Sequence, residues 1–335
     1  MAVPSQPRTP SWQSRVVHLL VRMRMRPHAL APIDPAWVRD NMGRPRAARQ
    51  WMARSTGARS ELYAPAGLWP GGERVWWPSN GAAADPAAPV LLYLHGGGFI
   101  GCSPETHRPL VASLVRRLGG EAFVPGYRLA PEHPHPAALH DAIAAYRHVV
   151  HERGVAPSRL VVVGDSAGGG LALALVMALR DSGEPQPAGV VMFSPWTDLA
   201  GTGPSLDENS DRCAMFAGDT IRRASHFYLG DMDPTNPLVS PLFGDFSGLP
   251  PLLLHASQDE VLRDDAVRVA ARAREAGVGV TLRLWRHVPH VWQFFAAVLP
   301  EARESLDDAV AFIGAVTASR QSRANHQNSV APVTT

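Results

Sequence analysis

The stretch Leu160-Val161-Val162-Val163-Gly164-Asp165-Ser166-Ala167-Gly168 decides the fold of this 335-residue chain. Its four consecutive aliphatic residues predict a strand buried on both faces, as strands of parallel sheets are. A helix is expected from Gly168 to Arg180. A serine between such a strand and such a helix lies on a sharp, strained turn, with its hydroxyl projecting above the sheet. Side chains two residues before and after it would clash, which explains both glycines.

Ser166 is therefore predicted to be a catalytic nucleophile. The helix that begins beside it directs its free N–H groups at the reaction centre and favours negative charge there. The alternative is a glycine-rich turn that only packs, and the flanking strand and helix make it the weaker interpretation.

The alternation of apolar strands and helices continues on both sides of this turn. It is typical of a doubly wound, mainly parallel sheet flanked by helices, so the fold class is α/β. Strands are expected near 90–94, 122–124, 160–163, 189–193, 251–255 and 278–285, and helices near 107–118, 137–153, 168–180 and 263–275, with a last helix from about 291.

Residues 200–247 break this alternation with Gly, Pro, Asp and Asn. An insertion there would lie over the carboxyl edge of the sheet, where ligands bind in such folds. We expect N-terminal cap helices over residues 1–60 and a catalytic domain over 61–318, with a cap insertion near 200–235. Residues 319–335 are expected to form a disordered tail.

The composition limits the partners of the chain. It is 45% hydrophobic and carries a formal net charge of +2, but residues 1–60 hold eleven arginines against two aspartates. Such an arm can bind nucleic acid or an anionic membrane; we favour an amphipathic segment that packs by its apolar face, with no nucleic-acid partner.

The apolar run 16–21 is too short for stable membrane insertion. Two cysteines, Cys102 and Cys213, indicate neither a disulfide framework nor a metal site, which favours a cytoplasmic location.

The loop His95-Gly96-Gly97-Gly98-Phe99 directly follows the strand near 90–94. Three glycines in a row let backbone amides turn inward and donate to a developing oxyanion, with the amide of Ala167 as a further donor. A phosphate-binding loop is the rival interpretation, but the chain contains no Walker sequence and no lysine. His95 is expected to anchor this loop.

A catalytic serine of this kind needs an acid and then a base further along the chain. Asp259 follows the strand near 251–255, while the adjacent Glu260 is expected to point elsewhere, and helix capping explains Asp264 and Asp265. His290 follows the last strand and is the preferred base, with His287 as second choice. Asp259 would then fix the tautomer of His290, which would deprotonate Ser166.

Four motifs together resemble the hormone-sensitive-lipase-like family of esterases, bacterial family IV, over roughly residues 75–315. They are His95–Phe99, Tyr127-Arg128-Leu129-Ala130-Pro131-Glu132, Gly164–Gly169, and Asp259-Glu260-Val261-Leu262 with His290 downstream. The resemblance implies an α/β-hydrolase fold with a helical cap and the triad Ser166, Asp259 and His290. It also implies Gly96, Gly97 and Ala167 as oxyanion donors, and a homodimer through the last strand and helix.

The expected activity is hydrolysis of short- to medium-chain carboxylic esters through an acyl-enzyme on Ser166, without metal or cofactor. The sequence departs from the family pattern at Gly126, His135 and Val291-Trp292. The resemblance therefore does not identify the leaving group of the substrate. Lactone or N-acetyl hydrolysis by the same triad is therefore an alternative, and a non-catalytic small-molecule receptor is another, which the presence of His290 disfavours. Phe99 and Trp196 are expected to line a substrate pocket.

Overall fold

The structure of the chain is a computed structural model, and it describes residues 9–42, 57–63, 71–76 and 87–329. Its centre is a single sheet with the strand order β1-β2-β4-β3-β5-β6-β7-β8. The strands from β4 to β8 run parallel, whereas β1 and β2 pair antiparallel at one edge. The strands are β1 (Arg59–Tyr63), β2 (Gly72–Trp76), β3 (Val90–Leu94), β4 (Glu121–Pro125), β5 (Leu160–Asp165), β6 (Gly189–Phe193), β7 (Leu252–Ser257) and β8 (Val280–Trp285).

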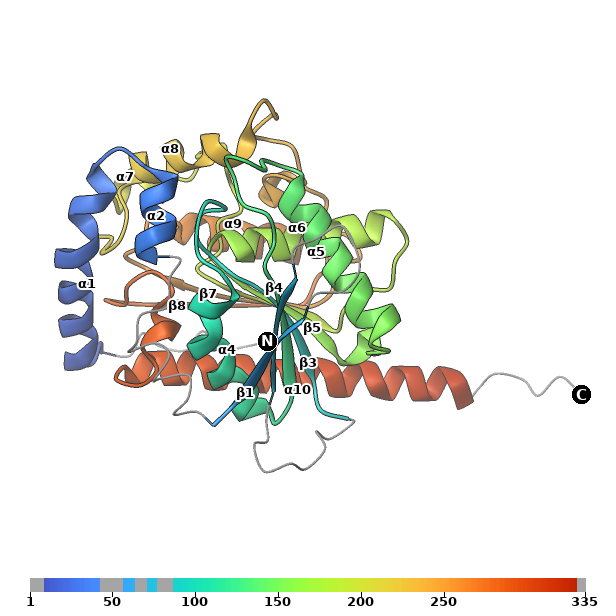
Figure 1. Cartoon of the computed structure of the whole chain (residues 1–335). Coiled ribbons are helices and arrows are strands. Elements are labelled where there is room, and N and C mark those ends of the chain that lie inside the picture. Colours follow the sequence, from blue (N-terminus) through green and yellow to red (C-terminus); the bar gives the residue numbers. More distant parts are fainter. Residues whose placement is uncertain (1–8, 43–56, 64–70, 77–86, 330–335) are drawn as a thin grey trace, which may run out of the picture.

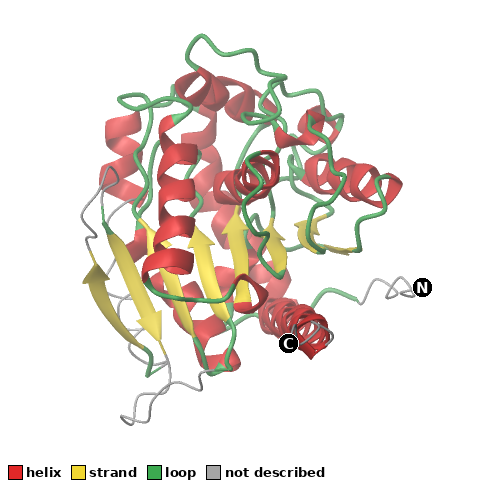
Figure 2. Cartoon of the chain, turned by 90° about the vertical axis from the view of Figure 1, so that its right-hand side faces the viewer, coloured by secondary structure: helices red, strands yellow, loops and turns green. Residues whose placement is uncertain are grey.

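Helices cover both faces of the sheet, as Figure 2 shows with the sheet seen between them. One core cluster packs strand residues such as Leu92 against α5, α6 and α9, and a second packs Leu91 against α4 and α10. The alternation of Leu91 and Leu92 between the two clusters follows from the period of two in a strand. These helices are α4 (Pro104–Leu118), α5 (Ala137–Arg147), α6 (Ala167–Asp181), α9 (Arg263–Glu275) and α10 (Pro300–Ser329), with short helical turns η1 (His148–Glu152), η2 (Pro157–Arg159), η3 (Pro241–Phe243) and η4 (Trp292–Phe295).

Four further helices lie together at one end of the molecule (Figure 1). They are α1 (Trp12–Leu30), α2 (Pro35–Met42), α7 (Ser205–Glu208) and α8 (Gly218–Leu229). Hydrogen bonds join the N-terminal pair to the inserted pair, because Thr220 donates to the carbonyl of Ala29 at 2.6 Å and Arg26 donates to that of Phe216. The two segments predicted to form a cap thus contact each other, although residues 43–56 of the first lie outside the described residues.

The predicted alternation is confirmed in order and direction, with three differences. The last helix, predicted from about residue 291, begins at Pro300 and follows the short turn η4. The sequence did not predict β1 and β2, because short, partly polar antiparallel edge strands lack the continuous apolar run of a buried strand. The predicted disordered tail was wrong over residues 319–329, since α10 continues to Ser329. Its last turns extend a helix whose earlier part packs against the sheet, and helix propagation costs less than nucleation.

Candidate active site

Ser166 lies between β5 and α6 in the strained turn that the sequence predicted. Its backbone has φ 52° and ψ −123°, outside the usual regions for a residue with a side chain. A Cβ atom at Gly164 would lie 2.2 Å from the carbonyl oxygen of Gly168, and one at Gly168 would lie 2.1 Å from that of Leu94. Both positions therefore exclude any side chain, and the turn can close only with glycine.

The buried carboxylate beside His290 belongs to Glu260. Its Oε2 lies 2.6 Å from His290 Nδ1, while its Oε1 accepts the amide of Ser257 at 2.7 Å. Both side chains are almost fully buried, and a charge-assisted hydrogen bond gains strength when it is shielded from water. The geometry is that of an acid that fixes the tautomer of a catalytic histidine.

The expectation that Asp259 pairs with His290 was wrong. The Oδ2 of Asp259 accepts the amide of His287 at 2.8 Å. Asp259 lines an open surface pocket of about 560 Å³, together with residues such as Arg212 and Arg286. Consecutive residues of this tight turn point in opposite directions, so only one of two neighbouring carboxylates can face the histidine, and nothing in the local sequence says which.

The turns that carry Ser166 and His290 are both fastened to the carboxyl end of β6. The amide of Ser166 donates to the carbonyl of Phe193 at 2.9 Å, and the amide of Val291 donates to the hydroxyl of Ser194 at 3.2 Å. His290 Nε2 is buried and has no hydrogen-bond partner among the described residues. An unpaired buried ring nitrogen is costly unless another group uses it, and catalytic hydrogen bonds are often long in structures without substrate.

The glycine loop after β3 differs in one respect from the prediction. The amide of Gly96 donates to Asp165 Oδ1 at 3.1 Å, and it is also 3.3 Å from His107 Nε2, so this amide is already used. The assignment of Gly96 as an oxyanion donor was therefore wrong. Gly97, with φ 119°, and Gly98 are partly exposed, and among the described residues neither amide has an acceptor.

A buried polar network holds this loop from below. Asp165 accepts from the hydroxyl of Tyr93 at 2.8 Å and lies beside His107. Burial opposes the charge of Asp165, but His107 and Tyr93 outweigh it and keep the pKa of Asp165 below its ordinary value. Burial also lowers the pKa of His95 to about 3, so that its imidazole is neutral at physiological pH. Its Nδ1 lies 2.7 Å from the carbonyl of Gly96, as expected of an anchor.

The Tyr127–Glu132 motif braces the same loop. The hydroxyl of Tyr127 donates to the carbonyl of His95 at 2.6 Å, and the Tyr127 ring stacks on the His95 ring. The amide of Ala130 donates to the carbonyl of Phe99 at 2.8 Å. Arg128 makes a bidentate pair with Asp141, through Nε to Oδ2 and Nη2 to Oδ1. The motif therefore positions the glycine loop and takes no part in chemistry itself.

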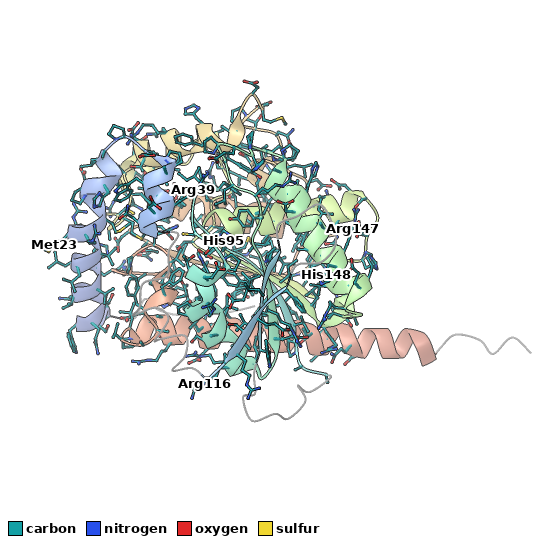
Figure 3. All side chains as sticks on the ribbon, viewed as in Figure 1. Met23, Arg39, His95, Arg116, Arg147 and His148 are labelled. Carbon is teal, nitrogen blue, oxygen red and sulfur yellow. The ribbon has the colours of Figure 1, made fainter. Side chains whose placement is uncertain are left out.

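Arg39 on α2 joins this brace to the cap, and Figure 3 labels it together with His95. Its guanidinium donates to the carbonyl of Ile100 at 3.0 Å, to that of Ala130 at 2.7 Å, and to both oxygens of Glu132. The hydrogen bond from Arg39 lowers the pKa of Glu132 to about 2. One side chain of the cap thus holds both the end of the glycine loop and the brace beneath it. Arg39 is not among the predicted site residues, because in the sequence it looks like any other arginine of the basic N-terminal arm.

Replacing Arg39 by alanine should lower kcat by about 10- to 100-fold, because a shift of about 1 Å in a catalytic group has an effect of that size. KM should change less, since the loop acts mainly on the transition state. Steady-state kinetics on a soluble ester measure both constants. Asn41→Ala on the same helix is the matched control, and Arg39→Lys should recover only part of kcat, because lysine has no planar fork. Unchanged kinetics in a folded Arg39→Ala protein would show that α2 does not position the loop.

Phe99 and Trp196 lie close together, with ring centroids 6.1 Å apart, and Phe99 stacks on Tyr228 of α8. Each keeps only 2% of its surface exposed. They form part of the core under the cap, and a role in lining a substrate pocket stays a prediction. Phe216, which is half-buried, has its ring edge-on to His290 at 5.3 Å and so lies closer to the candidate chemistry.

The chain is similar in sequence to known hydrolases. The alpha/beta hydrolase fold family matches residues 91–294. An acetyl-hydrolase from Streptomyces hygroscopicus is 44% identical over 228 residues, which are 68% of this chain and 76% of that protein. An esterase from Acinetobacter venetianus is 36% identical over 227 residues, 68% and 75% of the two chains.

The similarity to solved structures extends over nearly the whole chain. The crystal structure of EstE5 superposes with a TM-score of 0.79 at 33% identity and covers 92% of this chain and 99% of that one. An esterase of the bacterial hormone-sensitive lipase family superposes with a TM-score of 0.77 at 35% identity, covering 91% and 98%.

The chain therefore belongs to the alpha/beta hydrolase fold family. Its relatives within that family are bacterial esterases of the hormone-sensitive lipase type, so the resemblance found in the sequence is confirmed. Its activity is carboxylic ester hydrolysis. In the described part of the chain, no helix is both long and apolar enough to cross a membrane.

Proposed function

We propose that the chain hydrolyses short- to medium-chain carboxylic esters with the triad Ser166, His290 and Glu260. The observation that carries this proposal is the buried Glu260–His290 pair, whose free Nε2 belongs to a turn fastened beside Ser166. The pair orients the imidazole and stabilises the imidazolium that forms when it accepts a proton.

In the first half of the reaction, His290 Nε2 takes the hydroxyl proton of Ser166 while Oγ attacks the ester carbonyl. The carbonyl oxygen becomes an oxyanion, which accepts hydrogen bonds from the amides of Gly97, Gly98 and Ala167. The C–O bond to the alcohol then breaks, and His290 gives its proton to the departing oxygen. An acyl-enzyme on Ser166 remains.

In the second half, His290 takes a proton from water as the water oxygen attacks the acyl carbon. The same three amides hold the second oxyanion. Collapse releases the carboxylic acid, and the proton returns from His290 to the Oγ of Ser166. The protons balance without a cofactor: the proton of Ser166 leaves on the alcohol, and a proton from water replaces it through His290.

A series of p-nitrophenyl esters tests the substrate range. Acetate and butyrate should be the best substrates, octanoate weaker and palmitate negligible. The acetyl-hydrolase among the relatives and the p-nitrophenyl butyrate soaked into EstE5 crystals support this range. A folded enzyme that prefers palmitate, or that hydrolyses none of the four, would contradict it. Lactones and N-acetylated compounds are the next substrates to test, because the same triad can act on them.

We also infer a cytoplasmic enzyme, since the chain has two cysteines in 335 residues, too few for a disulfide framework. A homodimer through the β8 edge is consistent with the strand order, in which β8 pairs only with β7 among the described strands, and with its half-buried residues. Sedimentation of the purified protein tests the dimer.

A further inference from the structure

Helix α1 exposes an unusual amount of apolar surface. Among the described residues, most of the exposed large hydrophobic side chains lie on this one helix, with between 45% and 72% of their surface accessible. They are Trp12, Val16, Leu19, Leu20, Met23 and Leu30. A soluble protein rarely concentrates exposed apolar side chains in this way unless they have a partner.

These six residues form one stripe along the helix. Their spacings of three, four and seven residues place them within about 100° of each other around the axis. The opposite side of α1 packs on the protein: the hydroxyl of Ser14 donates to the carbonyl of His287, and Ala29 is buried. The expectation that this segment packs by its apolar face was therefore wrong for α1. Figure 1 shows α1 as the outermost helix of the cap, and Figure 3 shows Met23 on its outer side.

Positive charge borders the stripe on both sides. Arg15 and Arg24 are exposed, and by the helical period they lie on opposite flanks of the apolar residues. Residues 12–30 contain four arginines and no acidic residue. An apolar stripe with a cationic margin is the pattern by which an amphipathic helix lies in the headgroup region of a membrane.

We propose that the outer face of α1 docks the enzyme on an anionic lipid surface. The charge argues against a second copy as the partner, because a two-fold contact through this face would bring the arginines of two α1 helices together. Anionic headgroups match the arginines, and the acyl region accepts the apolar stripe. This role rests on the proposed function: docking would present esters dissolved in the lipid to the active site. Helix α1 contacts the turn that contains His287, close to that site.

Vesicle sedimentation tests this proposal without any turnover. Vesicles of phosphatidylcholine with phosphatidylglycerol should bind the wild type at least about tenfold more tightly than phosphatidylcholine alone, since each arginine near an anionic surface adds to binding. Raising the salt from low to high concentration should weaken the binding. Ser166→Ala should bind as the wild type does, so loss of catalysis and loss of docking are separate results.

The double variant Leu19→Asp/Met23→Asp should lose at least about tenfold in vesicle binding. It should keep its folding and its hydrolysis of soluble p-nitrophenyl acetate, because neither side chain touches the active site. Leu62→Asp is the matched control, since Leu62 is 75% exposed but lies on β1. Absence of wild-type binding to anionic vesicles at low salt, or equal binding by the double variant, would overturn the proposal. A dimer that the double variant abolishes, with no vesicle binding, would also overturn it.

Discussion

Ser166→Ala should lose about 10⁶-fold in kcat on p-nitrophenyl acetate, the scale measured when a serine hydrolase loses its nucleophile. The alanine fits the turn, because only the hydroxyl is removed from a backbone fixed by Gly164 and Gly168. The variant should therefore unfold at the wild-type temperature. Initial rates measured with a high enzyme concentration resolve a loss of this size.

The residual activity of Ser166→Ala should come from the oxyanion amides and substrate binding alone. Contaminating host esterase sets the lowest activity that can be measured for the variant. A mock preparation from cells without the variant is therefore purified and assayed beside it. Activity within about tenfold of wild type would remove Ser166 from the mechanism, since nucleophile loss elsewhere costs far more than that.

Glu260→Gln should lower kcat by about 10⁴-fold, as removal of the charged partner of a catalytic histidine does in other hydrolases. The amide is nearly isosteric with the carboxylate, but it cannot stabilise the imidazolium of His290. Its NH₂ group can also donate to Nδ1, which favours the wrong tautomer of the ring. The stability of the fold should fall only modestly. Steady-state kinetics with the melting temperature of the same preparation separate the two effects.

Asp259→Asn is the matched control for Glu260→Gln, because it removes the neighbouring carboxylate and keeps its shape. Its kcat should stay close to wild type, since Asp259 accepts the His287 amide and faces the surface pocket. The reverse outcome, a large loss for Asp259→Asn and a small one for Glu260→Gln, would restore the pairing predicted from the sequence.

The sequence was sufficient for the parts of the fold that rest on periodicity and on glycine. The apolar strand before Gly164, the helix after Ser166 and the glycine run after β3 each carry a strong local signal, and the structure has all three. The right-handed connection of parallel strands then restricts the possible sheet orders. The place of His290 after the last strand was set by the same alternation.

The errors fall where two equivalent groups compete within one turn. Asp259 and Glu260 are adjacent carboxylates, and Ser257 and Asn209 decide between them: the Ser257 amide donates to Oε1 of Glu260, and the Asn209 side chain donates to the Glu260 carbonyl. Gly96 and Gly97 have adjacent amides, and Asp165 accepts the hydrogen bond of the Gly96 amide. Asn209 is 51 residues from Glu260 and Asp165 is 69 residues from Gly96, so the local sequence does not contain the deciding contacts.

Labelling of the nucleophile tests the central claim most directly. A p-nitrophenyl phosphonate ester should add one phosphonyl group per chain and stop hydrolysis. After trypsin digestion the added mass should lie on the peptide from Leu160 to Arg180, in which Ser166 is the only hydroxyl side chain. Ser166→Ala should remain unlabelled. Two results would contradict the assignment of Ser166 as nucleophile. One is loss of activity with the label on another peptide, and the other is full activity with the label on the Leu160–Arg180 peptide.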